Sequence, residues 1–554
     1  MLINVDRFGS LQPIVSPRLL NGYMGQTALN CKLVSGDLES WRAPLSVNTP
    51  SKAGTKKSIY LWADQYWFHW TDDVDVCRGP VAGDITERTY FTGGSAFSPK
   101  MTYNPIAVSG GSTDYPNNTY DLGIPAPTTA PTVSVSGTAP GADDVVETRV
   151  YVYTYVSELG EEGPPSPASA SVDVGPAQHV DLSALLTGPA SGSYNLTKKR
   201  IYRVVTSDNG SDYLLVNTDD NLALATTTYS DTVATDDLGE ILPTTLYDPP
   251  PDDLAGLTPF PGGVLVGFSG NQLCPSEPYI PYAYPTTLRL TTDHPIVAIG
   301  VFDTTVVVTT TGPTYLVTGS TPDTWTMTKL SDIGAGGGDS RVLESCVSKR
   351  GLVDMGGWIM YPVSSGIVSI GDAGAALISK EFLSQDQWQA LNPSSIHAYP
   401  WNGKYVGFYD NGTNQGGFLF DPKNPLDPFS YTDVYATAGY LDKKSGKLYL
   451  QIGDDIKEWD GGNTDLSRTW RSKLFVTPKP VSFACARVRA YAYPVTFKLY
   501  ADGTLKHTKN VTSDAPFWLP SGYLAKEWEI QLEGTAKVKS AAIATSLAEL
   551  KQAA

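Results

Sequence analysis

Histidine is the residue with which a search for metal or acid–base chemistry in this chain begins. None of the five histidines stands in an HxH, HxxxH or HExxH spacing. A zinc centre or a nucleophilic triad needs side chains that converge on one point. The sequence therefore predicts no catalytic site and no metal site, and we expect a protein that is not an enzyme. The five are His69, His179, His294, His397 and His507.

Clustered carboxylates could hold a hard cation such as Ca²⁺, which prefers oxygen ligands. Such clusters lie at Asp72–Asp75 (DDVD) and at Asp454–Asp460. The first lacks the spacing of an EF-hand loop, because no glutamate follows at the twelfth loop position. We interpret both clusters as solvated loops and expect no bound cofactor.

A glycine-rich stretch, Gly334–Asp339 (GAGGGD), is the nearest approach to a phosphate-binding loop. It lacks the Lys-Ser/Thr pair that such a loop needs to hold the phosphates and Mg²⁺. We interpret it instead as a flexible loop between blades that could act as a gate or as a contact arm. The candidate gate residues are Gly334, Gly336, Gly337 and Gly338.

Paired carboxylates also perform glycoside hydrolysis. An acidic β-protein offers many Asp/Glu pairs, so sequence spacing cannot select a catalytic pair. The regular parallel β-helix coils of sugar-cleaving phage spikes are not visible in this sequence.

The loop Cys274–Pro285 (CPSEPYIPYAYP) is the most distinctive stretch of the chain. Aromatic side chains and prolines in a loop make rigid, amphipathic contact surfaces. Two interpretations stay open: the rings cap the end of a strand unit, or they contact a neighbouring subunit. The candidate residues are Pro278, Tyr279, Pro281, Tyr282 and Tyr284.

Composition favours strands and turns over helices. The chain has 554 residues, with 52 Gly and 41 Pro spread along it and with 31 Tyr and 12 Trp. Aromatic and β-branched residues fit a pleated sheet. The net charge of −17 disfavours a basic surface that grips nucleic acid, because like charges repel. It suits a surface past which DNA must slide.

Five cysteines are scattered along the chain, and none forms a CxxC pair. We expect free, partly buried thiols in a protein made in a reducing cytosol. No apolar run approaches the ~18 residues of a membrane span, and the N-terminus has no signal-peptide pattern. The cysteines are Cys31, Cys77, Cys274, Cys346 and Cys485.

The strands that position these residues are predicted from short apolar runs between Gly and Pro. Val264–Phe268, Ile296–Val301 and Thr305–Thr309 read as strands of a β-meander or a β-propeller blade. Ser58–Trp70 reads as a hairpin turning at Ala63-Asp64-Gln65, and Lys380–Leu391 as the one helix.

We therefore predict an all-β fold, a β-propeller-like body with two added sandwiches. Residues 1–125 are expected to form an N-terminal arm and the first blade or blades, followed by the Pro/Thr linker Pro125–Pro131. Residues 126–250 are expected to form an inserted immunoglobulin-like or fibronectin type III-like sandwich. The remaining blades are expected over 251–469, and a C-terminal β-sandwich over 470–554.

The string GGVLVGFSGNQLCPSEPYIPYAYP, followed by HPIVAIGVFDTTVVVTTTGPTYLVTGSTP, resembles tail proteins of short-tailed bacteriophages. The likeness continues through Cys346–Val353 and Trp358–Ile370, and it includes Gly22–Pro44 near the start and Ala486–Leu505 near the end. It covers most of the chain, and the insertion 126–250 is the part that we expect to vary. The family is the tail nozzle, or tail tubular protein B-like, group, which includes packaged-DNA stabilisation proteins. One departure is Tyr284, which stands where the family's SEPYxPxAWP-like string has Trp.

This resemblance implies a structural virion protein. Six copies would form a ring beneath the adaptor ring that sits under the portal, at the end of the tail channel. The ring would retain packaged DNA and then let it pass, so its expected partners are other copies of itself, the adaptor, tail fibres or spikes, and DNA through transient, non-specific contact. The expected location is the virion tail, after assembly in the host cytoplasm.

Two alternatives remain open at this point. One is a receptor-binding or polysaccharide-cleaving tail spike or fibre protein, which would form trimers. The other is a cellular β-propeller scaffold that binds peptides.

Overall fold

The computed structural model describes residues 1–205, 212–220, 222–330, 344–424 and 427–552. Strands dominate it, from β1 to β45, and the two α-helices of the described chain are short. The chain divides into two compact units. Unit 1 comprises Met1–Asp73, Val297–Leu316 and Thr328–Ala554, and unit 2 comprises Val74–Ile296 and Val317–Met327.

Four-stranded antiparallel meanders are the repeating element of the fold. Each is built from strands that follow one another in the chain. Some neighbouring strands are joined by short turns with Gly or Asp at positive φ, such as Gly262 and Gly263 between β19 and β20 and Asp303 between β23 and β24, whereas longer loops join β8 to β9 and β10 to β11. In unit 2 they are β8–β11 and β19–β22. Their bounds are β8 Asp75–Arg78, β9 Thr89–Thr92, β10 Lys100–Thr102, β11 Tyr120–Asp121, β19 Ala255–Phe260, β20 Val264–Ser269, β21 Gln272–Pro275 and β22 Leu290–Thr291.

The meander β23–β26 follows directly, and β27–β30 comes next in unit 1. The run Thr305–Thr310 forms β24, where Val306, Val307 and Val308 are fully buried. The other bounds are β23 Ile296–Phe302, β25 Tyr315–Thr318, β26 Thr326–Lys329, β27 Val353–Asp354, β28 Trp358–Val363, β29 Gly366–Gly371 and β30 Gly374–Leu377.

The last meander of unit 1 is completed by an N-terminal strand. β5 (Leu45–Asn48) pairs antiparallel with β37 (Asp455–Glu458) beside β36 and β35. The hairpin of β6 and β7 turns at Ala63 and Asp64, both at positive φ, as the sequence predicts. Further bounds are β6 Ser58–Trp62, β7 Tyr66–Trp70, β31 His397–Trp401, β32 Lys404–Asp410, β33 Gln415–Phe420, β34 Phe429–Thr432, β35 Ala438–Asp442 and β36 Lys447–Ile452.

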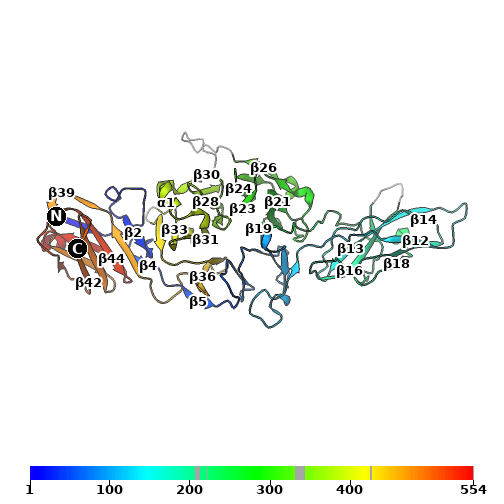
Figure 1. Cartoon of the computed structure of the whole chain (residues 1–554), viewed down its shortest axis with the longest axis horizontal. Coiled ribbons are helices and arrows are strands. Elements are labelled where there is room, and N and C mark those ends of the chain that lie inside the picture. The colour runs from blue at the N-terminus through cyan, green and yellow to red at the C-terminus, as the bar shows by residue number, and fades with distance from the viewer. Residues whose placement is uncertain (206–211, 221, 331–343, 425–426, 553–554) are drawn as a thin grey trace. The chain divides into compact units, whose positions relative to one another are not determined.

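Residues within the predicted insertion form a β-sandwich of two sheets, β12-β15-β18 and β14-β13-β16-β17 (Figure 1, cyan and teal). The long strands β13 and β16 pair along their length. The tyrosines at alternate positions of β13, Tyr151, Tyr153 and Tyr155, lie in the core. The bounds are β12 Thr132–Gly137, β13 Glu147–Ser157, β14 Val172–Val174, β15 Gln178–Ser183, β16 Leu196–Val205, β17 Leu214–Leu215 and β18 Tyr229–Asp231.

The two ends of this sandwich meet at Gly123. Its φ is +88°, and a Cβ there would lie 2.7 Å from Pro250 and 2.8 Å from Pro249. Only glycine tolerates both the close approach and the left-handed backbone. The chain therefore leaves unit 2's meanders and re-enters them at one place, as an insertion requires.

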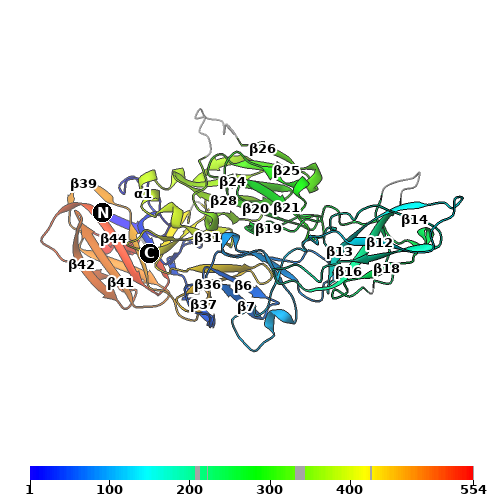
Figure 2. The same ribbon diagram turned by 45° about the vertical axis from the view of Figure 1, so that its right-hand side comes forward.

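The C-terminal strands form a second sandwich together with strands from the N-terminus (Figure 2). One sheet has the order β1-β45-β40-β43. The strands β2-β38-β44-β41-β42, with β39 beside β44, belong to a ten-stranded sheet that continues from β2 through β34, β33 and β32 to β31. The bounds are β1 Leu2–Val5, β2 Gly25–Leu29, β38 Arg468–Ser472, β39 Phe475–Val481, β40 Cys485–Ala490, β41 Val495–Ala501, β42 Thr504–Val511, β43 Phe517–Trp518, β44 Ala525–Gly534 and β45 Val538–Ala544.

The core of this sandwich contains Trp470, Phe497 and Trp528. Trp470 donates a hydrogen bond to the Gly9 carbonyl (2.9 Å), and its ring lies 4.9 Å from Phe8. The N-terminal segment is thus part of the C-terminal core.

The predicted helix Lys380–Leu391 is wrong in extent. The structure has a 3₁₀ turn at Ile378–Glu381 and a five-residue helix, α1 (Gln385–Gln389). Ser384 caps α1 by accepting a hydrogen bond from the Gln387 amide, so the helix starts there and cannot continue from the preceding turn.

The predicted fold class, an all-β propeller-like body with an inserted immunoglobulin-like or fibronectin-like sandwich and a C-terminal β-sandwich, is confirmed. Among the described residues no helix is long and apolar enough to cross a membrane.

Candidate functional site

The Tyr/Pro loop between β21 and β22 is held by backbone hydrogen bonds, both within the loop and to Gly263 and Asp248 outside it. The Glu277 amide donates to the Ala283 carbonyl (2.9 Å), and the Tyr279 amide donates to the Gly263 carbonyl (2.9 Å). The Tyr284 amide donates to the Asp248 carbonyl (2.7 Å). These bonds hold the backbone of the loop at Glu277, Tyr279 and Tyr284.

The tyrosines of this loop divide between the interior and the surface. Tyr284 is fully buried in the core shared by β8–β11 and β19–β22, and burial raises the pKa of its hydroxyl. Tyr282 is half-buried, with its ring 6.3 Å from Tyr247, and burial also raises its pKa. Pro281 is buried and Pro278 half-buried.

Tyr279 is the exposed member. Its side chain is 59% exposed and its φ is +60°. The ring lies over Gly263, where a Cβ would come within 2.5 Å of it. The glycine therefore makes room for a ring that the loop presents to solvent, and Tyr279 is the loop residue available for a contact.

The candidate gate residues Gly334, Gly336, Gly337 and Gly338 lie outside the described residues.

A buried carboxyl lies near Tyr282. Glu161 is 5% exposed and accepts a hydrogen bond from Arg88 Nη1 (3.3 Å). Burial raises the pKa of Glu161 to about 7, although Arg88 opposes the shift. The neighbouring Asp84 differs, since hydrogen bonds from Thr86 and Arg88 outweigh its burial and bring its pKa to about 2. Glu161 is thus the carboxyl here that gains a proton near neutral pH.

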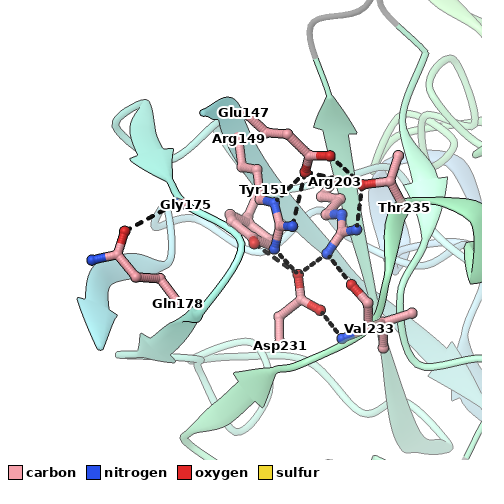
Figure 3. A network of polar contacts seen from close by, with 9 residues as sticks. All are labelled: Glu147, Arg149, Tyr151, Gly175, Gln178, Arg203, Asp231, Val233 and Thr235. Atoms are coloured by element: carbon pink, nitrogen blue, oxygen red, sulfur yellow. Dashed lines mark hydrogen bonds and ion pairs between the residues drawn. The ribbon is translucent and has the colours of Figure 1, made fainter. Parts of the chain in front are cut away.

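A second polar network lies within the inserted sandwich (Figure 3). The fully buried Asp231 accepts hydrogen bonds from Tyr151 Oη (2.7 Å) and from Arg203, which is also fully buried. Arg149 approaches the same carboxylate at 3.7 Å and binds Glu147 at 2.8 Å. The carboxylates and guanidinium groups balance one another, so this network is a charge-neutral support of the strands.

A pocket of about 350 Å³ opens beside this network. Glu147 and Arg149 line it together with Val174, Pro176 and Gln178. Gln178 Oε1 accepts a hydrogen bond from the Gly175 amide (3.0 Å), which fixes that wall (Figure 3). Sequence analysis missed this cluster, because the only available signal was charged residues at inward positions of two alternating strands.

A larger pocket, of about 420 Å³, lies on the C-terminal sandwich within unit 1. It is lined by three basic residues and two acidic residues, together with Tyr491 and Pro494. The charged residues are Lys32, Arg42, Lys537, Glu39 and Asp465. Sequence analysis missed it too, because its residues come from segments more than 400 positions apart.

The wall of this pocket is supported by Arg468, which is fully buried. Its guanidinium donates to Ser40 Oγ (2.9 Å) and to the carbonyls of Gly534 (3.1 Å) and Ala536. Burial lowers the pKa of Arg468. This charge is thus held mainly by neutral acceptors, in contrast to the ion pairs of the inserted sandwich.

The cysteines and histidines lie apart from one another. The sequence predicts partly buried thiols outside disulfides; in the structure all five cysteines are buried and none forms a disulfide bond. Burial raises the pKa of Cys31 to about 12 and those of Cys274 and Cys346 to about 11. Burial lowers the pKa of His397. In the described part of the chain, no three His, Cys, Asp or Glu side chains gather as metal ligands would.

The acidic clusters have protein partners. Asp73 forms an ion pair with Lys349 (2.9 Å). Asp455 accepts a hydrogen bond from Thr49 (2.7 Å), and hydrogen bonds to hydroxyl groups lower its pKa.

No protein-family model matches the chain, and neither does any curated protein. Among solved structures, the extracellular domain of BT4673 from B. thetaiotaomicron is 10% identical, with a TM-score of 0.31; 92% of this chain is covered, but it spans only 61% of that one. Apo AztD from Citrobacter koseri is 10% identical over 68% of this chain and 100% of its own, with a TM-score of 0.27. An exo-β-1,3-galactanase from Phanerochaete chrysosporium is 10% identical over 74% of this chain and 99% of its own, with a TM-score of 0.22.

Proposed function

We propose that this protein is the tail nozzle of a short-tailed bacteriophage. Six copies form a ring at the tip of the tail tube, beneath the adaptor ring, where they retain the packaged DNA and give it a channel for ejection. The protein acts structurally and carries out no reaction.

One observation carries this proposal. The central strings that resemble the nozzle family, residues 262–285, 294–322 and 358–370, contain strands from three consecutive meanders of the fold. They hold β20 and β21, then β23, β24 and β25, and then β28 and most of β29. The SEPYIPYAYP string is the structured loop that buries Tyr284 and presents Tyr279. A resemblance whose strings fall on strands of successive meanders supports a shared architecture.

The charge supports the same function. The net charge of −17 makes non-specific retention of DNA on the protein unfavourable, because the phosphates are repelled. A channel wall richer in Asp and Glu than in Lys and Arg is therefore expected. Packed β-sheets also suit a tube that must keep its bore while DNA moves through it.

The proposal is tested by stoichiometry. Cryo-electron microscopy of virions is expected to find this chain in a six-fold ring at the tail tip. Three copies per spike would contradict the nozzle and favour the receptor-binding alternative. Release of reducing ends from host polysaccharide by the purified protein would contradict a purely structural role.

The Tyr/Pro loop offers a sharper test of how the ring forms. Tyr279→Ala is expected to weaken ring assembly while the thermal unfolding temperature stays within about 2 °C, because an exposed ring contributes little to folding. Leu246→Ala is the control, since Leu246 is comparably exposed at 52%. Intact rings with an earlier melt would show that Tyr279 only caps the strands.

A further inference from the structure

Charge is distributed very unevenly between the two sandwiches. Residues 1–44 and 468–554, which contain all strands of the C-terminal sandwich, hold 17 Lys and Arg against 9 Asp and Glu. Residues 126–250, the inserted sandwich, hold 5 Lys and Arg against 17 Asp and Glu. In a protein of net charge −17 the C-terminal sandwich is therefore a basic body, complementary to the acidic insertion.

The acidic sandwich presents one fully exposed loop. Every residue from Gly137 to Val146, between β12 and β13, is exposed. Asp143 and Asp144 stand there beside Val145, which is 80% exposed, and Val146, which is 43% exposed. Asp144 accepts a hydrogen bond from the Gly141 amide (2.7 Å), so the loop has a defined turn. Exposed valines next to carboxylates make a short segment with both an acidic and an apolar part.

The C-terminal sandwich has a pocket whose lining includes cationic and aromatic side chains, which complement the acidic and apolar parts of the loop. The 420 Å³ pocket is lined by the basic residues Lys32, Arg42 and Lys537, by the acidic residues Glu39 and Asp465, and by the 61% exposed Tyr491. The ammonium of Lys539 lies 4.0 Å from the centre of the Tyr491 ring.

Some of these charges are already neutralised within the chain. Lys32 pairs with Asp460, and Lys537 pairs with Asp37 and Glu39. Arg42 and Lys539 have no carboxylate within ion-pair distance in the described structure, and both are exposed. They are the cations left for an incoming anion.

We propose that the acidic loop 137–146 of one copy docks into this pocket of a second copy. The carboxylates of Asp143 and Asp144 pair with Arg42 and Lys539, and Val145 packs against Tyr491 and Pro494. The contact joins two different surfaces, so it is heterologous, and repeated head-to-tail contacts of this kind close into a ring. The inference rests on the proposed ring and names the contact that builds it.

Charge reversal tests the contact. A pocket variant, Arg42→Glu with Lys539→Glu, and a loop variant, Asp143→Lys with Asp144→Lys, are each expected to weaken self-association at least about tenfold at low salt. Each reversal places like charges opposite one another. Because all four residues are exposed, circular dichroism and melting temperature should stay unchanged.

A mixture of the two variants is the most direct test of the contact. The loop variant carries a basic loop, which is complementary to the acidic pocket of the pocket variant. The pocket variant keeps the acidic wild-type loop, which is complementary to the wild-type pocket of the loop variant. Equimolar mixtures are therefore expected to recover assembly as alternating rings, seen by mass photometry or negative-stain microscopy. Lys52→Glu and Asp236→Lys with Asp237→Lys are the matched controls, since all three residues are exposed, and they should assemble as wild type does.

Three results would overturn the inference. The first is assembly that persists in both variants, and the second is a mixture that stays monomeric. The third is a pocket variant that loses affinity for duplex DNA but still forms rings, because the basic surface would then face nucleic acid. In each case a six-fold ring in virions would leave the proposed function standing, whereas its absence from virions would remove the function itself.

Discussion

The inserted sandwich and the C-terminal sandwich share a two-layer β architecture but are built in different ways. The inserted one is made from a single stretch of chain, and its ends meet at Gly123. The C-terminal one takes β1 and β2 from the beginning of the chain and the rest of its strands from the end. A continuous stretch folds on local contacts, whereas a split one needs both ends of the chain before its core closes.

Their interiors differ as well. The inserted sandwich buries Arg203 and Asp231 together, with tyrosine hydroxyls as further partners. The C-terminal sandwich packs Trp470 and Trp528 and holds its one fully buried arginine, Arg468, with neutral oxygens. Buried ion pairs are costly to break singly, while an apolar core loses stability in proportion to the volume removed. We therefore expect the inserted sandwich to be destabilised most by loss of one member of its buried ion pair, and the C-terminal sandwich by removal of apolar side chains.

The largest effect is expected from Asp231→Ala in the inserted sandwich. It leaves the fully buried Arg203 without its carboxylate, which should cost about 3–5 kcal/mol. Hydrogen exchange of β13 and β16 should speed up, while that of β40 and β45 should not change. Asp236→Ala, at an exposed position, is the control. Unchanged exchange in the Asp231 variant would show that the network does not support the strands.

Removal of Met1–Val5 should destabilise the other sandwich by at least about 3 kcal/mol. Ile3 and Val5 are buried against the C-terminal strands, and each such side chain contributes about 1.5–3 kcal/mol. Exchange protection should fall in β45, the partner of β1, and not in β13. Excision of residues 126–249 is the converse control and should leave β45 protected. Equal losses in both sandwiches after truncation would contradict their independence.

The pH dependence of unit 2 should be set by Glu161. Its folded pKa of about 7 lies above its ordinary value of 4.5, so the folded state holds this proton more tightly than the unfolded state does. Stability should fall as pH rises from about 4.5 to about 7 and stay level above, a change on the order of 3 kcal/mol. Arg88, Asp84, Tyr90 and Tyr282 are the groups that face it.

Glu161→Gln should remove this slope, as measured by hydrogen exchange of unit 2 at about pH 5 and about pH 8. The opposite trend is expected for Glu549, beside the N-terminal amine in the C-terminal sandwich. Hydrogen bonds to that amine and to Thr545 lower its pKa to about 2, so its stabilising contribution is lost only as pH falls below about 4.5. A slope that survives in Glu161→Gln would assign the titration to another group.

Local sequence patterns predicted the structure correctly where residues that are close together in the chain are also close together in the fold. The β-branched run Thr305–Thr309 lies in the buried strand β24, and the apolar run Val264–Phe268 lies in β20. The hairpin turn at Ala63 and Asp64 was readable because the chain must reverse between two aromatic strands. The helix over Lys380–Leu391 failed because Ser384, read as helix interior, is a cap.

The candidate functional sites could be predicted from local sequence only in part. The Tyr/Pro loop was recognisable from composition, but its division into buried Tyr284 and exposed Tyr279 depends on Gly263 and on Asp248, which lie outside the loop. The pocket that contains Arg42 and Tyr491 had no signal, since its residues are far apart in the chain.

By itself, the sequence determined the all-β class, the contiguous insertion, the free cysteines and the overall acidity, because each depends on composition or on residues close together in the chain. Only the tertiary structure decided that the two chain ends share one core, that Asp231 meets Arg203, and that a basic pocket lies on a protein of net charge −17. Those features depend on long-range packing, which buries apolar surface wherever the fold brings it together and leaves no local periodicity to read.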